Sequence, residues 1–210
     1  MGEKWEEAVK GIKKNCIAVI MESVTHLEQL AERIAADNDK EAYEQLFYQF
    51  YDKLLRFAIS FLKQEEIAEE IVSDVFVNIW RNRTNLPAIL NLQPYLYVAT
   101  RNLCLRYLAR VRKNSALSIH VINSEFLSSP YQTPEEKMLS SEMISKIENA
   151  IEKLPPQCRL IFVLIKENGL KYKEVAQVLN LSVKTVEAQM AIATKRIHSA
   201  VDIAFIHLKN

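Results

Sequence analysis

The sequence predicts an all-α protein, with two small helical domains joined by a flexible linker and the second domain ending in a helix-turn-helix. Apolar residues recur at three- and four-residue spacing through most of the chain. The chain has 3 glycines, which favours long helices with few tight turns. A stretch rich in Ser, Asn and Pro interrupts the pattern. The predicted division is an N-terminal extension (1–21), a first domain (22–113), a linker (114–134) and a second domain (135–210).

The first domain opens with two predicted helices. The apolar stripe of the first helix consists of Leu27, Leu30, Ala31 and Ile34. Asp39 follows a short polar break and can accept a hydrogen bond from the next helical turn, so it is the predicted N-cap of the second helix. That helix has a broad apolar stripe that runs from Tyr43 to Phe61.

Two further helices complete the first domain. One begins near Glu65, with acidic residues in its first turn as the helix dipole prefers, and its apolar face ends at Ile79. A polar loop from Arg81 to Leu92 follows. Pro94 then lies in the first turn of a helix that runs to about Arg112, a position that tolerates proline because its missing N–H is not needed there.

Helical spacing returns after the linker. One helix is marked by Met138, Met143, Ile144, Ile147 and Ile151 and ends before the two prolines at 155 and 156. Pro156 can start the next helix. Its apolar run LIFVLI would also suit a strand, but the Asn168-Gly169 pair is a helix C-cap signal and the flanking segments are helical, so we predict a helix.

The last two helices have the spacing of a helix-turn-helix. Small Ala176 lies where the two helices would touch, Asn180 tolerates the left-handed backbone of the turn, and Ser182 caps the second helix. The inward face of the second helix is predicted to be Val186, Met190, Ala193 and Ile197. Its exposed N-terminal end, which enters the DNA major groove in this motif, carries Lys184, Thr185, Glu187, Ala188 and Gln189.

These exposed side chains suit DNA contacts. Lys184 and Lys195 can bind phosphate, Gln189 can pair with adenine, and Glu187 can accept a hydrogen bond from cytosine N4. An ordinary helical hairpin on a core is the alternative interpretation. Because non-specific affinity follows phosphate neutralisation, this weakly basic module should bind DNA feebly alone and need a second contact or a larger partner.

Several kinds of site are excluded by composition. No glycine lies between residues 12 and 168, so neither a P-loop nor a dinucleotide-binding fingerprint can be built there. Cys16, Cys104 and Cys158 are far apart, so we expect neither a disulfide framework nor a metal site. Paired carboxylates and nucleophile motifs are also missing. We therefore expect no enzyme, no catalytic residue, no cofactor and no small-molecule substrate.

The N-terminal segment gives no sign of a membrane anchor. Its apolar run CIAVIM is too short for a membrane span or a good signal-peptide core. We therefore expect a cytoplasmic protein. Met21 is an alternative start, since the helical pattern begins only after it.

Charge is segregated along the chain although the formal net charge is +1. Residues 75–124 contain no Asp or Glu, and they follow a segment rich in acids. One surface should be acidic and the next basic, which suggests two partners of opposite sign. Ordinary solvated helix faces are the alternative interpretation, which explains the acidic segment fairly well but explains the acid-free span less well.

Both halves resemble one family. AYEQLFYQFYDKLLRFAISFLKQEEIAEEIVSDVFVNIW followed by LQPYLYVATRNLCLRYLAR resembles region 2 of the sigma-70 family, and LPPQCRLIFVLIKENGLKYKEVAQVLNLSVKTVEAQM resembles region 4. With a short linker between them, the chain resembles an extracytoplasmic-function (ECF) sigma factor over residues 27–197. The linker and the LPPQCR motif resemble the group paired with membrane anti-sigma factors of uptake systems.

The resemblance implies partners and roles. It implies a dissociable initiation subunit that directs RNA polymerase core to promoter DNA, binding the β and β′ subunits. The β′ coiled coil would meet Glu69, Glu70, Ser73 and Asp74, where the family usually has Gln in place of Ser73. A membrane-bound anti-sigma factor is a further implied partner.

The resemblance also divides the DNA contacts between the two regions. The −10 element would meet Tyr95, Tyr97, Arg101, Asn102, Arg106, Arg110, Arg112 and Lys113. Asn102 would line a pocket for an extruded base, and the tyrosines would stack on bases or else lie in the core. The −35 element would meet Lys184, Thr185, Glu187, Ala188, Gln189 and Lys195. Some relatives have arginine at Glu187, Gln189 and Ile192, so Ile192 indicates a different −35 preference.

A self-standing helix-turn-helix regulator is the alternative function. It would use residues 1–110 as a sensor or dimerisation domain, and it leaves the basic span around Asn102 unexplained. Specific DNA binding without polymerase would favour it.

Overall fold

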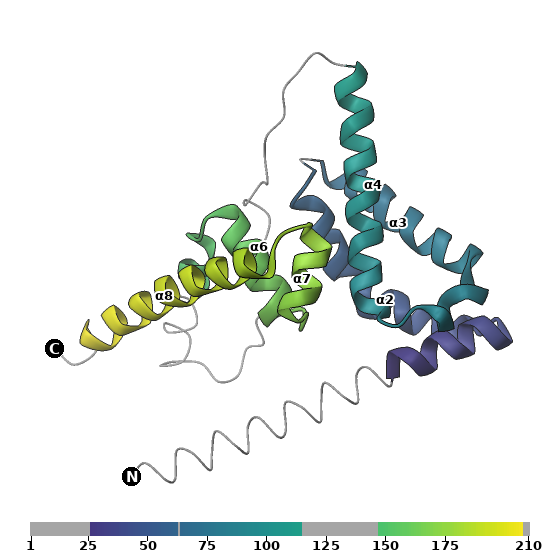
Figure 1. Cartoon of the computed structure of the whole chain (residues 1–210), viewed down its shortest axis with the longest axis horizontal. Coiled ribbons are helices and arrows are strands. Elements are labelled where there is room, and N and C mark those ends of the chain that lie inside the picture. Colours follow the sequence, from purple (N-terminus) through teal and green to yellow (C-terminus); the bar gives the residue numbers. More distant parts are fainter. Residues whose placement is uncertain (1–25, 63, 115–146, 208–210) are drawn as a thin grey trace, which may run out of the picture. The chain divides into compact units, whose positions relative to one another are not determined.

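The computed structural model describes residues 26–62, 64–114 and 147–207, and these ranges contain helices and no strand (Figure 1). The helices are residues 26–37, α2 (Lys40–Ile59), α3 (Glu65–Arg81), the 3₁₀ helix η1 (Arg83–Ala88), α4 (Leu92–Asn114), residues 147–152, α6 (Pro156–Lys166), α7 (Tyr172–Leu179) and α8 (Val183–His207). The predicted N-terminal extension, the alternative start at Met21 and nearly all of the predicted linker lie outside the described residues. None of the described helices is long and apolar enough to span a membrane.

The described residues fall into two compact units, one within Met1–Phe50 and Phe76–Gln93, the other within Tyr51–Val75 and Pro94–Asn210. The first unit buries apolar side chains from the helix over residues 26–37, the start of α2, the end of α3 and η1. These side chains are Leu27, Leu30, Ala31, Ile34, Ala42, Leu46, Phe50, Phe76, Ile79 and Leu86. The predicted stripe of the first helix is therefore confirmed as a buried face.

Asp39 starts α2 as predicted. Its carboxylate accepts a hydrogen bond of 3.0 Å from the backbone N–H of Ala42 and forms a 2.7 Å ion pair with Arg33. These contacts lower the pKa of Asp39, with the Ala42 N–H as the largest cause. The preceding Asn38 has a left-handed backbone, with φ 52°, and its side-chain oxygen accepts a hydrogen bond from Arg83. The turn before α2 is thus held by side chains on both sides of it.

An aromatic cluster joins α2 to the end of α3 in the same unit. The Tyr43 hydroxyl donates a 2.9 Å hydrogen bond to the Phe76 carbonyl, and its ring lies edge-on to Trp80 at 4.9 Å. The guanidinium of Arg83 lies 4.9 Å from the centre of the Trp80 ring and donates to the Trp80 carbonyl. The segment that was predicted as a polar loop therefore begins with an anchored 3₁₀ helix.

The second unit contains the end of α2, the start of α3 and α4. Its core includes Leu54, Phe57, Ala68, Val72, Val75, Leu96, Tyr97 and Cys104. The rings of Phe57 and Tyr97 pack edge to face, with centroids 5.1 Å apart. Thr100 is buried in α4 and satisfies its hydroxyl by donating to the Leu96 carbonyl at 2.8 Å. The predicted bounds of α3 and α4 agree with the structure to within two residues, whereas α2 ends at Ile59, before Phe61.

Helices α6, α7 and α8 pack on one another within the second unit (Figure 1). Pro156 starts α6 as predicted, and the run that could have been a strand is helical and mostly buried. Gly169, with φ 75°, ends that segment in the left-handed region, and the Leu170 N–H bonds to the Leu164 carbonyl at 3.0 Å. The C-cap signal therefore identified the helix correctly.

Candidate protein and nucleic-acid interfaces

The acidic residues predicted to bind polymerase share the outer surface of α3. Glu69, Glu70, Ser73 and Asp74 are all exposed, while the neighbouring Ala68, Ile71, Val72 and Val75 are buried. This separation follows the 3.6-residue period of the helix. The Ser73 hydroxyl donates to the Glu69 carbonyl at 2.8 Å, so its hydrogen is used within the helix. The surface therefore consists of three carboxylates and one serine hydroxyl, whose hydrogen already forms a bond within the helix.

Helix α4 presents its candidate DNA-binding residues on two faces. Tyr95, Asn102 and Arg106 are separated by seven and four residues, so they fall on one face. Arg101 and Arg112 are eleven residues apart and share a different face. Asn102, Arg106, Arg110 and Arg112 are exposed, and Arg101 is half-buried. The face with Tyr95 combines an exposed ring, an amide and cations, which are the groups that single-stranded DNA binders use.

Tyr97 lies in the core, which is the second of the two alternatives predicted for the tyrosines. Its side chain is fully buried and packs edge-on to Phe57, so the ring is not available to stack on a base. Burial also raises the pKa of its hydroxyl. Tyr95, two residues earlier, is 43% exposed and remains a candidate for stacking. The two tyrosines differ because a two-residue step rotates the side chain by about 200° around a helix.

The turn between α7 and α8 has the geometry of a helix-turn-helix. Asn180 adopts φ 55° and ψ 51°, and the Leu181 N–H bonds to the Ala176 carbonyl at 2.8 Å. This six-to-one hydrogen bond with a left-handed residue is a Schellman helix end. Ala176 is buried, as predicted for the contact between the two helices. The Ser182 hydroxyl accepts from the Thr185 N–H at 3.0 Å, so Ser182 caps α8 as predicted.

The inward and outward faces of α8 are clearly separated. Val186, Met190 and Ala193 are buried and Ile197 is half-buried. The predicted contact residues Lys184, Glu187, Ala188 and Lys195 are exposed, and Thr185 and Gln189 are half-buried. Arg196 is also exposed and was missed by the prediction; its place four residues after Ile192 was the available signal.

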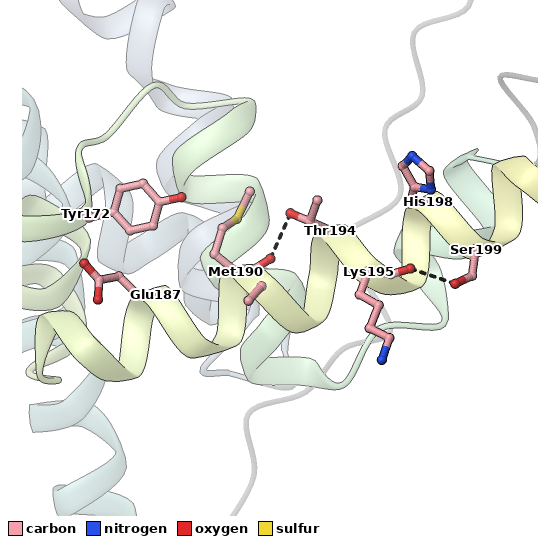
Figure 2. A pocket seen from close by; sticks show the side chains of 8 residues that line it. Tyr172, Glu187, Met190, Thr194, Lys195, His198 and Ser199 are labelled. Carbon is pink, nitrogen blue, oxygen red and sulfur yellow. Dashed lines mark hydrogen bonds between the residues drawn. The ribbon is translucent and has the colours of Figure 1, made fainter.

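A groove of about 750 Å³ runs beside α8, as Figure 2 shows. Tyr172 from α7 and Glu187 line one end, and His198 and Ser199 line the other. Thr194 lies between them and donates to the Met190 carbonyl at 2.9 Å. Lys195 projects away from Tyr172 and His198 in this view. Glu187 lies next to Tyr172 at the groove. It is therefore on the side of α8 that borders the face with Ala188, and not on that face itself.

No group of three or more metal-ligating side chains occurs among the described residues. Cys104 and Cys158 are buried thiols, and burial raises the pKa of Cys104 to about 12. Burial likewise raises the pKa of Cys158. These two cysteines are packed, protonated side chains at neutral pH.

The chain matches two models of one family. Residues 46–114 match sigma-70 region 2, and residues 144–197 match sigma-70 region 4. It is 25% identical to the RNA polymerase sigma-H factor of Pseudomonas aeruginosa over 179 residues, which covers 82% of this chain and 92% of that protein. It is 23% identical to the ECF RNA polymerase sigma-E factor of Escherichia coli K12 over 184 residues, which covers 83% of this chain and 96% of that protein.

Two solved structures align with this chain at a similar level of sequence identity. CnrH, in complex with the cytosolic domain of CnrY, aligns with a TM-score of 0.49 at 22% identity and covers 85% of this chain and 98% of that chain. RpoE from Bartonella quintana, in complex with the anti-sigma factor NepR, aligns with a TM-score of 0.49 at 20% identity. The alignment covers 77% of this chain and 97% of that chain. The family assignment rests on the two regions, present in the family's order, and on relatives that match along most of their length. The chain belongs to the sigma-70 family and is an ECF RNA polymerase sigma factor.

Proposed function

We propose that this sigma factor divides its work between three surfaces of the described residues. The acidic face of α3, with Glu69, Glu70, Ser73 and Asp74, binds the β′ coiled coil of RNA polymerase core. The face of α4 that carries Tyr95, Asn102 and Arg106 binds the −10 element, with Arg101, Arg110, Arg112 and Lys113 on phosphates. The exposed side of α8 binds the −35 element. The factor itself catalyses no reaction.

The segregation of charge between α3 and α4 is the observation that carries this proposal. Glu69, Glu70 and Asp74 are exposed on α3, and the exposed charges of α4 are arginines. Carboxylates favour a basic protein surface, and arginines favour phosphate. A protein that binds DNA alone has no use for the acidic face. A subunit that must bind both a polymerase and its promoter needs both faces.

A binding measurement with polymerase core tests the protein-binding surface. The double variant Glu70→Arg, Asp74→Arg is expected to lose at least tenfold in affinity, because each reversal replaces an attraction with a repulsion. Its matched control is Glu28→Arg, Glu32→Arg, which reverses two exposed acids on the helix over residues 26–37. Equal affinity of all three proteins for core would overturn the assignment of α3.

We further propose that the factor acts in the cytoplasm, where polymerase and chromosomal DNA are found, and that an anti-sigma factor can hold it inactive. Such a partner would cover the acidic face of α3 and the exposed side of α8 together. A pull-down from membranes of the bacterium that encodes the chain tests this. The partner should compete with polymerase core for the wild type and bind more weakly to the Glu70→Arg, Asp74→Arg variant. A partner that binds both proteins equally would contradict this masking arrangement.

A further inference from the structure

Helix α8 exposes an apolar side chain on the side that faces away from the protein core. Ile192 is 41% exposed, whereas Val186, Met190 and Ala193 of the same helix are buried. Ala188 lies one turn before Ile192 and Thr185 lies about two turns before it, so these residues share one face. The Thr185 hydroxyl is engaged with the Ser182 hydroxyl at 2.8 Å in the cap. We call Thr185, Ala188 and Ile192 the apolar strip.

Cations border the apolar strip on both sides. Lys184 and Lys195 are eleven residues apart, so they lie along one border, and Lys195 also lines the groove beside α8 (Figure 2). Arg196 is exposed and lies one turn beyond Ile192, along the other border. Phosphate backbones line both sides of the major groove, so this arrangement would place cations near phosphates and apolar groups near base edges.

The base edges of the major groove carry one apolar group that a protein can recognise. Guanine, cytosine and adenine present hydrogen-bonding groups there, and thymine adds its C5 methyl group. An isoleucine side chain cannot form a hydrogen bond with any base. It can, however, pack its own methyl groups against the methyl group of thymine and bury it. The chemistry of the apolar strip therefore matches thymine.

We propose that Ile192 and Ala188 select thymine in the −35 element by contact with its C5 methyl group. This inference rests on the proposed function, in which α8 reads the −35 element. The strip from Thr185 to Ile192 is about 10 Å long at 1.5 Å per residue, which corresponds to about three base pairs at 3.4 Å each. The selected thymines therefore lie within about three consecutive base pairs, on either strand.

Replacement of thymine by uracil tests the proposal, because it removes the methyl group and leaves every hydrogen-bonding group in place. A promoter is first mapped by in vitro transcription of genomic DNA with reconstituted holoenzyme, and the preferred −35 bases are selected from a randomised segment. Duplexes with deoxyuridine at each selected thymine are then compared with the parent duplex. We expect holoenzyme affinity to fall about fourfold at the contacted position, as for one buried methyl group.

The Ile192→Ala variant shows whether that loss belongs to Ile192. Wild-type holoenzyme should lose affinity with uracil, and the variant should bind thymine and uracil duplexes equally, because the partner of the methyl group is gone. Thr194→Ala is the matched control: it truncates an exposed side chain in the groove and should keep the uracil penalty. Ile192→Arg should change the selected base from thymine to guanine.

The outcomes separate this inference from the function on which it rests. Holoenzyme that binds a −35 element without a thymine preference, or that binds uracil duplexes as tightly as thymine duplexes, overturns the role of the apolar strip and leaves the function intact. The same uracil penalty in wild type and Ile192→Ala also overturns it. Failure of the protein to bind core would overturn the function and the inference together.

Discussion

The thiol of Cys158 in α6 donates a hydrogen bond to the backbone carbonyl of Gln189 in α8, with 3.1 Å between sulfur and oxygen. Gln189 belongs to the half of α8 that we assign to the −35 element. Cys158 is fully buried and forms a cluster with Leu154 and Ala193, against which Phe162 and Ile197 pack. Cys158 therefore connects α6 to the helix that we propose reads the −35 element, and we expect it to help position that helix.

Replacement of Cys158 by alanine should loosen this junction. We expect the free energy of unfolding to fall by about 1–2 kcal/mol, because the change removes a buried sulfur and a weak hydrogen bond. Thermal unfolding of the whole chain measures it. Cys104→Ala serves as the comparison, since it removes a buried thiol from α4. A −35 affinity that falls for Cys158→Ala and not for Cys104→Ala would confirm the positioning role, and equal effects would contradict it.

The turn at Asn180 makes a second prediction. Asn180→Ala should cost about 1 kcal/mol, because alanine is strained at φ 55°. Asn180→Gly should be neutral or slightly stabilising, since glycine adopts this backbone without strain. Chemical denaturation of the three proteins measures both effects. A glycine variant as unstable as the alanine variant would show that the asparagine side chain, and not the backbone angle, holds the turn.

The two tyrosines of α4 should respond in opposite ways. Tyr97→Ala should destabilise the protein by about 3–5 kcal/mol, because it empties a core position against Phe57. Tyr95→Ala should leave stability almost unchanged and slow promoter opening, because base stacking contributes about 1–3 kcal/mol per base. Unfolding curves and permanganate footprinting of melted DNA measure the two effects. Normal opening by Tyr95→Ala would remove Tyr95 from the −10 surface.

Stability should fall in alkaline solution through the buried thiol of Cys104. Its pKa is raised from 9.0 in an unfolded chain to about 12 in the folded protein, so the folded state holds the proton longer. The stabilisation is fully present below pH 9 and is lost as the pH rises toward 12, by up to about 1.4 kcal/mol per pH unit. Denaturant unfolding at pH 8 and pH 10.5 measures this loss. Cys104→Ala should show a smaller loss, and an identical pH profile would contradict the assignment.

Ser73 offers a gain-of-affinity test. Ser73→Gln introduces the longer amide side chain that the family resemblance implies at this position, and we expect about threefold to tenfold tighter binding to polymerase core from one added hydrogen bond. Ser73→Ala should leave the affinity unchanged, because the serine hydroxyl already donates to the Glu69 carbonyl. Titration of core with labelled protein measures both variants. Weaker binding by the alanine variant would show that the hydroxyl itself reaches the partner.

Local signals explain why much of the fold could be predicted. Asn180, Ser182 and Gly169 act within a few residues of their own position, so the turn and both helix ends followed from the sequence. The anchoring of η1 did not follow, because Arg83 meets Asn38 across 45 positions of the chain. The burial of Tyr97 depends on packing against Phe57, which is distant in the sequence. The residues next to Tyr97 in the sequence do not indicate this contact.

The candidate interfaces were predictable to the extent that helical periodicity determines exposure. Glu69, Glu70, Ser73 and Asp74 are exposed because the intervening apolar residues are buried. Periodicity alone did not place Glu187 on the groove beside Tyr172, since the neighbouring helices decide which flank is covered.

The modest charge of α8 has a consequence for the distribution of this factor in a cell. A chromosome offers an enormous number of non-cognate sites, and their occupancy rises with the number of phosphates that a protein neutralises. A strip of Thr185, Ala188 and Ile192 between a few cations competes poorly for those sites. Helix α8 therefore contributes little to the retention of the free protein at non-cognate sites.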